Sequence, residues 1–192
     1  TIAQEHGRKL VTFRMFDEND NFDTASFEEK VKELLAKQER LVVILNTPAH
    51  NPTGYAMDED DWKAVSSILG RTEKGKKITL VADVAYIDFA GEEEESRMFL
   101  PFLEKMPDNV LVLVAHSLSK SYTLYGMRCG ALICMAKTRE IAEEFKSVCE
   151  FSSRGSWSNC ARAPQVILQK IYEDDRLLQK VMLERKNCRD ML

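Results

Sequence analysis

The chain has no excess of basic residues, no long apolar run and few histidines, and each absence argues against a class of protein. Lysine and arginine number 27 against 31 aspartate and glutamate residues, which gives a formal net charge of −4. Because no basic stripe recurs with aromatic residues, we expect no nucleic-acid binding. No apolar run approaches the length of a membrane span, so we expect neither a membrane anchor nor a signal peptide. The three histidines share no ligand spacing, and we expect no metal site.

Cysteine is also scarce and irregularly spaced. The five cysteines form no C-x-x-C pair and are odd in number. Such cysteines are most simply reduced, partly buried thiols, so we expect a cytoplasmic protein without disulfides. What remains is a chain of 192 residues that is 44% hydrophobic, enough to bury the core of one domain.

Apolar runs typical of strands alternate with amphipathic runs typical of helices. The predicted strands are Lys9–Phe13, Leu41–Leu45, Ile78–Ala82, Val110–Val114 and Gly130–Cys134. The predicted helices begin at about Thr24 and at Asp58, and cover Thr138–Glu150, Asn159–Tyr172 and Asp174–Leu192. Strands that are apolar throughout are typical of a sheet covered on both faces. We therefore predict an α/β fold with a mostly parallel sheet and helices on both faces, a three-layer α/β/α arrangement.

Both ends of the sequence look cut. It begins at Thr1 without a methionine, and it ends at Leu192 inside an amphipathic helical pattern with no Gly or Pro stop. We therefore expect residues 1–192 to be a piece of a longer protein.

Polar side chains follow three of the predicted strands. They are Asn51 after Leu41–Leu45, Asp83 and Tyr86 after Ile78–Ala82, and Ser117, Ser119, Lys120 and Arg128 after Val110–Val114. In an open parallel sheet, ligands bind outside the carboxyl ends of the strands. The sequence therefore predicts that these side chains converge at one edge of the sheet.

The residue types at this edge indicate a cofactor. The amine of Lys120 can form a Schiff base with an aldehyde, while hydroxyls and the Arg128 guanidinium can hold a phosphate. Pyridoxal 5′-phosphate has both groups. Each residue also has an ordinary explanation, since Asn51 lies in a turn sequence, Asp83 can cap the next segment and Arg128 can be a surface arginine. For the ordinary explanations to be right, a separate one would have to apply at each of three strand ends. A single cofactor site explains all three together, so we favour it.

Four motifs carry a family resemblance. They are Asn51-Pro52-Thr53-Gly54, Asp83-Val84-Ala85-Tyr86, Ser117-Leu118-Ser119-Lys120 and Leu124-Tyr125-Gly126-Met127-Arg128-Cys129-Gly130. In order and spacing they resemble the large domain of the fold-type-I, pyridoxal-phosphate-dependent aminotransferases of class I/II, particularly the aspartate and aromatic aminotransferases. The resemblance implies that residues 1–192 are part of the large, cofactor-binding domain, without the N-terminal segment and the small domain.

The resemblance also implies roles for the residues, with Lys120, Asp83 and Tyr86 as the catalytic ones. Lys120 resembles the lysine that holds the cofactor and then moves a proton between the substrate α-carbon and cofactor atom C4′. We expect its pKa to be lowered by desolvation near other cations. Asp83 resembles the carboxylate that pairs with the pyridine nitrogen and keeps it protonated. Asn51 and Tyr86 resemble the pair that binds the phenolic oxygen, and the phosphate ligands are Ser117, Ser119 and Arg128.

A further segment, Arg154–Asn159, resembles the family's arginine-x-x-aromatic-serine-asparagine stretch. The resemblance implies that Arg154 binds the side-chain carboxylate of a dicarboxylic substrate in the site of the partner subunit. The two prolines that follow this stretch in the family are replaced by Cys160 and Ala161. The alternative is an ordinary arginine at a helix start in a serine-rich loop.

The implied activity is transfer of an amino group from aspartate, glutamate or an aromatic amino acid to a 2-oxo acid, by a homodimer. The family's glycine-rich phosphate loop and its arginine for the substrate α-carboxylate are not identifiable here, so we expect little activity from this chain alone. Two alternatives remain: a pyridoxal-phosphate-dependent carbon–sulfur β-lyase, and the ligand-sensing domain of a transcription regulator. A Rossmann nucleotide binder is not supported, because no G-x-G-x-x-G follows a strand.

Overall fold

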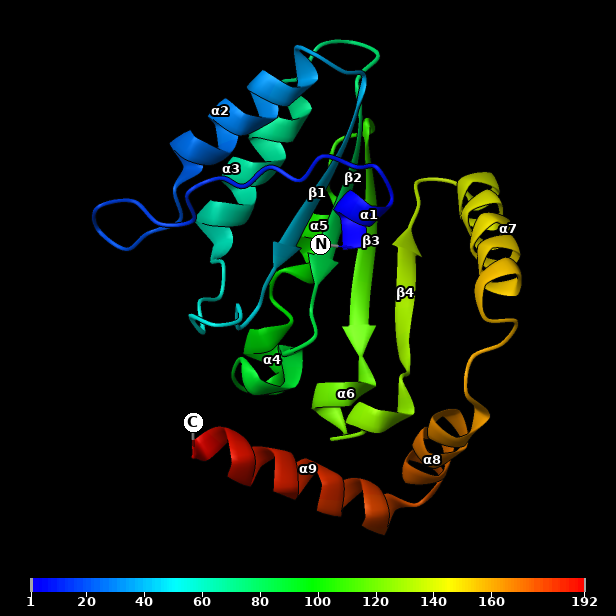
Figure 1. Ribbon diagram of the computed structural model, residues 1–192. Coiled ribbons are helices and arrows are strands. Elements are labelled where there is room, and N and C mark those ends of the chain that lie inside the picture. The colour runs from blue at the N-terminus through cyan, green and yellow to red at the C-terminus, as the bar shows by residue number, and fades with distance from the viewer. Residues whose placement is uncertain (1, 192) are drawn as a thin grey trace.

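A four-stranded sheet lies at the centre of the computed structural model, which describes residues 2–191 (Figure 1). Strands β1 (Arg40–Asn46), β2 (Lys77–Asp83) and β3 (Val110–Ser117) are parallel neighbours in that order, and β4 (Gly130–Met135) runs antiparallel to β3. The mostly parallel α/β fold predicted from the sequence is therefore confirmed.

The remaining elements are helical. They are α1 (Ile2–Glu5), α2 (Thr24–Leu35), α3 (Glu59–Gly70), α4 (Glu93–Ser96), α5 (Leu100–Glu104), α6 (Leu118–Ser121), α7 (Arg139–Ser156), α8 (Arg162–Glu173) and α9 (Asp175–Asp190), with 3-10 turns η1 (Ile87–Phe89) and η2 (Tyr125–Met127). Compared with the sequence prediction, α7 continues to Ser156 and α8 begins at Arg162. The predicted end of the last helix, Leu192, lies outside the described residues. Within residues 2–191, no helix combines the length and apolar character needed to cross a bilayer.

The main core lies between the sheet and helices α2 and α3, which sit side by side on one face (Figure 1). The side chains of Val65 and Leu69 on α3 and of Leu80 on β2 have no exposed surface. Full burial of a leucine side chain stabilises a fold by about 1.5–3 kcal/mol, so this face is the main source of stability.

Aspartates fix the starts of both core helices. Asp23 caps α2: its carboxylate accepts the backbone N–H of Ser26 at 2.9 Å and pairs with Arg14 at 2.6 Å. The Ser26 N–H and then the Arg14 guanidinium hold the pKa of Asp23 below its ordinary value. Asp58 caps α3 in a reciprocal box with Asp61. Each cap satisfies N–H groups that have no partner inside the helix.

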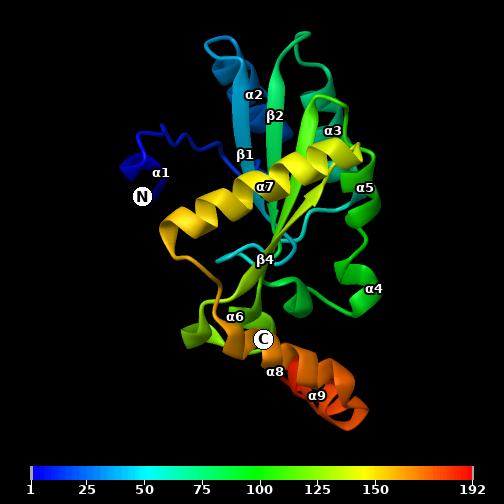
Figure 2. The same cartoon turned by 90° about the vertical axis from the view of Figure 1, so that its right-hand side faces the viewer.

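Helix α7 crosses the opposite face of the sheet (Figure 2). Phe145 and Val148 of α7 line one cavity together with Thr79 of β2 and Leu111 of β3. The second helical layer covers only part of this face, because Val42 and Ile44 on β1 remain 62% and 60% exposed. The unbroken apolar run of β1 therefore does not reflect burial on both faces within this chain.

The strand predicted at Lys9–Phe13 is absent from the structure, and this prediction was wrong. These residues run as irregular chain, and β2 is the one strand that pairs with β1 among the described residues. The apolar pattern is explained by side-chain packing instead. The ring of Phe13 lies 5.8 Å from that of Phe22 and 5.3 Å from that of Phe27, both in edge-to-face contact.

Gly130 sets the close approach of β4 to β3 next to the predicted site. It pairs with Ser117, and a Cβ at this position would lie 2.5 Å from the backbone oxygen of His116. Gly130→Ala is therefore expected to destabilise the fold by about 1–3 kcal/mol, the usual cost of forced overpacking. Urea unfolding measures the change, with Gly155→Ala in α7 as control because a Cβ there meets nothing within 4 Å. Equal stability of the two variants would contradict this account.

Candidate functional site

The carboxyl ends of the parallel strands bring polar side chains to one face of the sheet. Side chains alternate between faces along a strand, and Leu45 and Ala82 point into the main core, so Asn46 and Asp83 point to the opposite face. Asn46 pairs in register with Asp83, and Asp83 with Ala115. Ser117 lies two residues beyond Ala115 and so shares that face. Asp83 and Ser117 are therefore on the same side of the sheet, as the sequence prediction requires.

Asn46 connects the turn after β1 with the end of β2. Its side-chain Nδ2 donates to the backbone oxygen of Asp83 at 3.1 Å, and its Oδ1 accepts the backbone N–H of Asn51 at 2.8 Å. The Asp83 carboxylate is half-buried and accepts the backbone N–H of Ala85 at 3.1 Å. The motifs do not single out Asn46, although its position at a strand end was a usable signal.

Tyr86 lies at the centre of the site. Its hydroxyl accepts a hydrogen bond from Nδ2 of Asn51 at 3.3 Å. The Lys120 Nζ lies 5.1 Å from the centroid of the Tyr86 ring and 4.5 Å from that of Tyr125, within the range of cation–π attraction. The structure thus brings together the predicted residues Asn51, Tyr86 and Lys120, and adds Tyr125, which the sequence interpretation did not assign.

The environment of Lys120 differs from the expected one. Interaction with the Tyr86 side chain raises the pKa of its amine above the ordinary value, and burial opposes this with a smaller effect. The expected lowering of this pKa by neighbouring cations is therefore wrong, because the amine lies against the rings of two tyrosines, Tyr86 and Tyr125. Since a raised pKa favours the protonated amine, Lys120 has to lose a proton before it can attack an aldehyde.

Ser117, Ser119 and Arg128 gather around the short helix α6. Ser117 caps α6, its hydroxyl accepting the backbone N–H of Ser119 at 3.2 Å. Ser119 is buried, and its hydroxyl accepts a guanidinium N–H of Arg128 at 3.5 Å. The backbone of Arg128 is left-handed, with φ 50°, and its guanidinium also donates to the Tyr125 carbonyl at 2.8 Å. Two hydroxyls and a guanidinium together form a donor set suited to a phosphate.

Arg154 lies apart from this set. It occupies the last turn of α7, is exposed, and donates to the Ser158 hydroxyl at 2.6 Å. Within residues 2–191, no hydrogen bond or ion pair joins its side chain to the other predicted site residues. The alternative of an arginine at a helix start is wrong, since the residue ends a helix.

The cluster offers a reactive amine, a carboxylate, a phenol hydrogen-bonded to an amide, and a hydroxyl–guanidinium set. This combination matches the aldehyde, ring nitrogen, phenolic oxygen and phosphate of pyridoxal phosphate. In the described part of the chain, no group of three or more His, Cys, Asp or Glu side chains is arranged to hold a metal ion.

Known proteins share both the sequence pattern and the fold. An aminotransferase structure from Anaerococcus prevotii superposes with a TM-score of 0.94 at 36% identity, over 99% of this chain and 47% of that one. An aromatic-amino-acid aminotransferase of Pseudomonas aeruginosa is 34% identical over 152 residues, 77% of this chain and 36% of the relative. An aromatic-amino-acid aminotransferase from Burkholderia pseudomallei, covalently bound to pyridoxal phosphate, shares the fold at 23% identity, with a TM-score of 0.80 over 98% of this chain and 45% of that one.

The chain thus spans less than half the length of these relatives. A family model described as aminotransferase class I and II matches residues 1–192, the whole of the chain. The chain therefore belongs to the class I and II aminotransferase family.

Proposed function

We propose that residues 1–192 are part of the large, cofactor-binding domain of a pyridoxal-phosphate-dependent aminotransferase. The observation that carries the proposal is the position of the Lys120 amine. It lies 5.1 Å from the Tyr86 ring, whose hydroxyl contacts Asn51 at 3.3 Å. The sheet register, with Asp83 and Ser117 on one face at the carboxyl ends of β2 and β3, also supports the proposal.

Each side chain has a chemical task in this proposal. The amine of Lys120 attaches the cofactor, and Asp83 holds the proton on the pyridine nitrogen. Asn51 and Tyr86 donate hydrogen bonds to the phenolic oxygen. The phosphate is bound by Ser117, Ser119 and Arg128. The guanidinium of Arg128 can bind two phosphate oxygens at once, which a lysine amine cannot reproduce.

Pyridoxal phosphate, when bound, supplies a ring that stabilises negative charge at the α-carbon of an amino acid. The chain's own contribution is to orient the substrate and move the proton. Lys120 would hold the cofactor and, once displaced by the amino group of the substrate, would act as the base that moves the proton of the substrate α-carbon. Tyr86, whose ring centroid lies 5.1 Å from the amine, would help to hold Lys120 in place.

The proposed substrates are an amino acid and a 2-oxo acid. Arg154 supports a dicarboxylic substrate, because an exposed guanidinium at a helix end can reach a carboxylate of a second subunit. We further propose a homodimer, consistent with such an exposed position, and a cytoplasmic location. The location is supported by the free state of Cys129, Cys134, Cys149, Cys160 and Cys188.

Visible absorption tests the proposal. With pyridoxal phosphate, the protein at its full natural length is expected to show a pH-sensitive band that bleaches when an amino acid donates its amino group. Bleaching by aspartate or glutamate supports the dicarboxylic role of Arg154, while bleaching by aromatic amino acids alone supports the other substrate class. The 192-residue chain by itself is expected to show little or no turnover.

Two results contradict the proposal as a whole, and a third contradicts one part of it. One is the absence of any band that depends on Lys120. The other is release of pyruvate and thiol without transfer to a 2-oxo acid, which identifies a carbon–sulfur β-lyase. Robust turnover by residues 1–192 alone contradicts the part of the proposal that calls them an incomplete site.

A further inference from the structure

Arg185 on α9 reaches back to the helix that carries Lys120. Its Nε donates to the backbone oxygen of Ser121, the residue after Lys120, at 2.7 Å. Its guanidinium carbon lies 4.3 Å from the centroid of the Tyr122 ring. The side chain is only 19% exposed, so both contacts are largely shielded from water.

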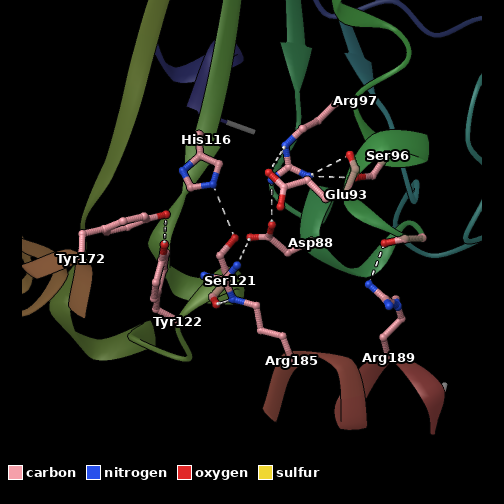
Figure 3. A network of polar contacts seen from close by, with 11 residues as sticks. Asp88, Glu93, Ser96, Arg97, His116, Ser121, Tyr122, Tyr172, Arg185 and Arg189 are labelled. Carbon is pink, nitrogen blue, oxygen red and sulfur yellow. Dashed lines mark hydrogen bonds and ion pairs between the residues drawn. The ribbon is translucent and has the colours of Figure 1, made fainter. Parts of the chain in front are cut away.

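The same guanidinium also contacts the segment that carries Tyr86. Arg185 lies 3.4 Å from a carboxylate oxygen of Asp88, which follows Tyr86 by two residues and has a side chain only 9% exposed (Figure 3). The other carboxylate oxygen of Asp88 pairs with Arg97 at 3.3 Å. Asp88 is thus held between two guanidiniums, and Arg185 joins it to α6.

This link matters because α6 is a single turn of helix, from Leu118 to Ser121. The last carbonyls of a helix have no partner inside it, and a short helix has little stability of its own. A charge-assisted hydrogen bond from Arg185 to the Ser121 carbonyl therefore fixes the end of the turn that positions Lys120. The ion pair to Asp88 fixes that turn relative to Tyr86.

Arg189, one turn further along α9, provides an internal comparison. It donates to the Gly91 carbonyl at 2.7 Å and pairs with Glu92, so it holds α9 against the segment after η1. Among the described residues, its side chain makes no hydrogen bond or ion pair with α6. Both arginines therefore anchor α9. Of the two, Arg185 is the one that also bonds to the helical turn carrying Lys120.

We propose that Arg185 is a positioning residue that, together with Asp88, sets the placement of the Lys120 amine over Tyr86. In this way α9 helps to determine the reactivity of a lysine that lies 65 residues earlier in the chain. The cofactor-dependent part of this inference rests on the proposed function, while the placement of Lys120 does not.

The test compares Arg185→Gln with Arg189→Gln in the protein at its full natural length. In the cofactor-free protein, lysines are labelled by reductive ¹³C-methylation and titrated by NMR, with the Lys120 signal assigned by its loss in Lys120→Ala. Because Tyr86 raises the pKa of this amine, Arg185→Gln is expected to lower it by about half a pH unit or more, which corresponds to a roughly threefold change in the protonation equilibrium. Arg189→Gln is expected to leave the pKa of the Lys120 amine unchanged.

With pyridoxal phosphate bound, Arg185→Gln is also expected to move the pH midpoint of the visible band, and Arg189→Gln is not. Arg185→Lys keeps the positive charge but not the planar guanidinium, so its pH midpoint is expected to fall between those of Arg185→Gln and the unaltered protein. If Arg185→Gln does not fold, Arg185→Lys is used in its place. Equal shifts in the Arg185 and Arg189 variants, or no shift in either, overturn the inference. Absence of a visible band in the unaltered protein rejects the proposed function instead, and the Lys120 titration then still decides this inference.

Discussion

Replacing Lys120 with alanine is expected to lower amino transfer by the full-length protein about 10²–10⁴-fold, the usual contribution of a positioned acid–base group, or more. Under the proposed function, the variant loses both the group that attaches the cofactor and the group that moves the proton. A coupled assay of amino transfer to a 2-oxo acid measures the change. Lys105→Ala, at an exposed position after α5, is the matched control and is expected to remain fully active.

Lys120→Arg separates two explanations of that loss. Arginine keeps the positive charge beside Tyr86 and Tyr125 but has no amine that can attack an aldehyde at neutral pH. We expect this variant to be as inactive as Lys120→Ala. Substantial activity in Lys120→Arg indicates that the residue contributes charge alone, which contradicts its assigned role.

Asp83→Asn is expected to lower the rate of amino transfer about 10²–10³-fold, as when one preorganised electrostatic contact is removed. The amide can still accept the backbone N–H of Ala85, which the carboxylate accepts at 3.1 Å, so the local fold is expected to survive. Under the proposed function, the substitution removes the negative charge that would hold a proton on the ring nitrogen. The cofactor is therefore expected to bind, with the loss appearing mainly in kcat.

The control for this variant is Asp108→Asn, an exposed aspartate in the turn before β3. It is expected to have unchanged kinetics. A rate in Asp83→Asn within about twofold of the unaltered protein, a difference of less than roughly 0.5 kcal/mol, means that Asp83 does not face the ring nitrogen.

The strand ends of this protein could be predicted from its sequence because the signals there are local. A buried parallel strand is a short apolar run, and the polar residue that ends it is the next in the chain, as with Asp83 after Ile78–Ala82. Once three such strands are placed side by side, their carboxyl ends share an edge. That rule brings Asp83 and Ser117 to one face of the sheet, and the contacts of Tyr86 extend the cluster to Asn51 and Lys120.

Other features depend on contacts between distant residues and leave no local signal. Lys9–Phe13 has the composition of a strand. The packing of Phe13 on two other rings holds this segment in place without hydrogen bonding to a neighbouring strand. The raised pKa of Lys120 depends on a tyrosine from another loop. Arg185 is 64 residues from the carbonyl to which it donates, and its helix pattern alone indicates only an exposed charge.

The central claim is that one lysine of this chain, at the end of β3, is the attachment point for a phosphorylated aldehyde cofactor. Borohydride reduction of the full-length protein with stoichiometric pyridoxal phosphate, followed by peptide mass mapping, tests it most directly. The account predicts a single phosphopyridoxyl label on Lys120, lost in Lys120→Ala. Labelling spread over exposed lysines, or concentrated on a different lysine, contradicts it.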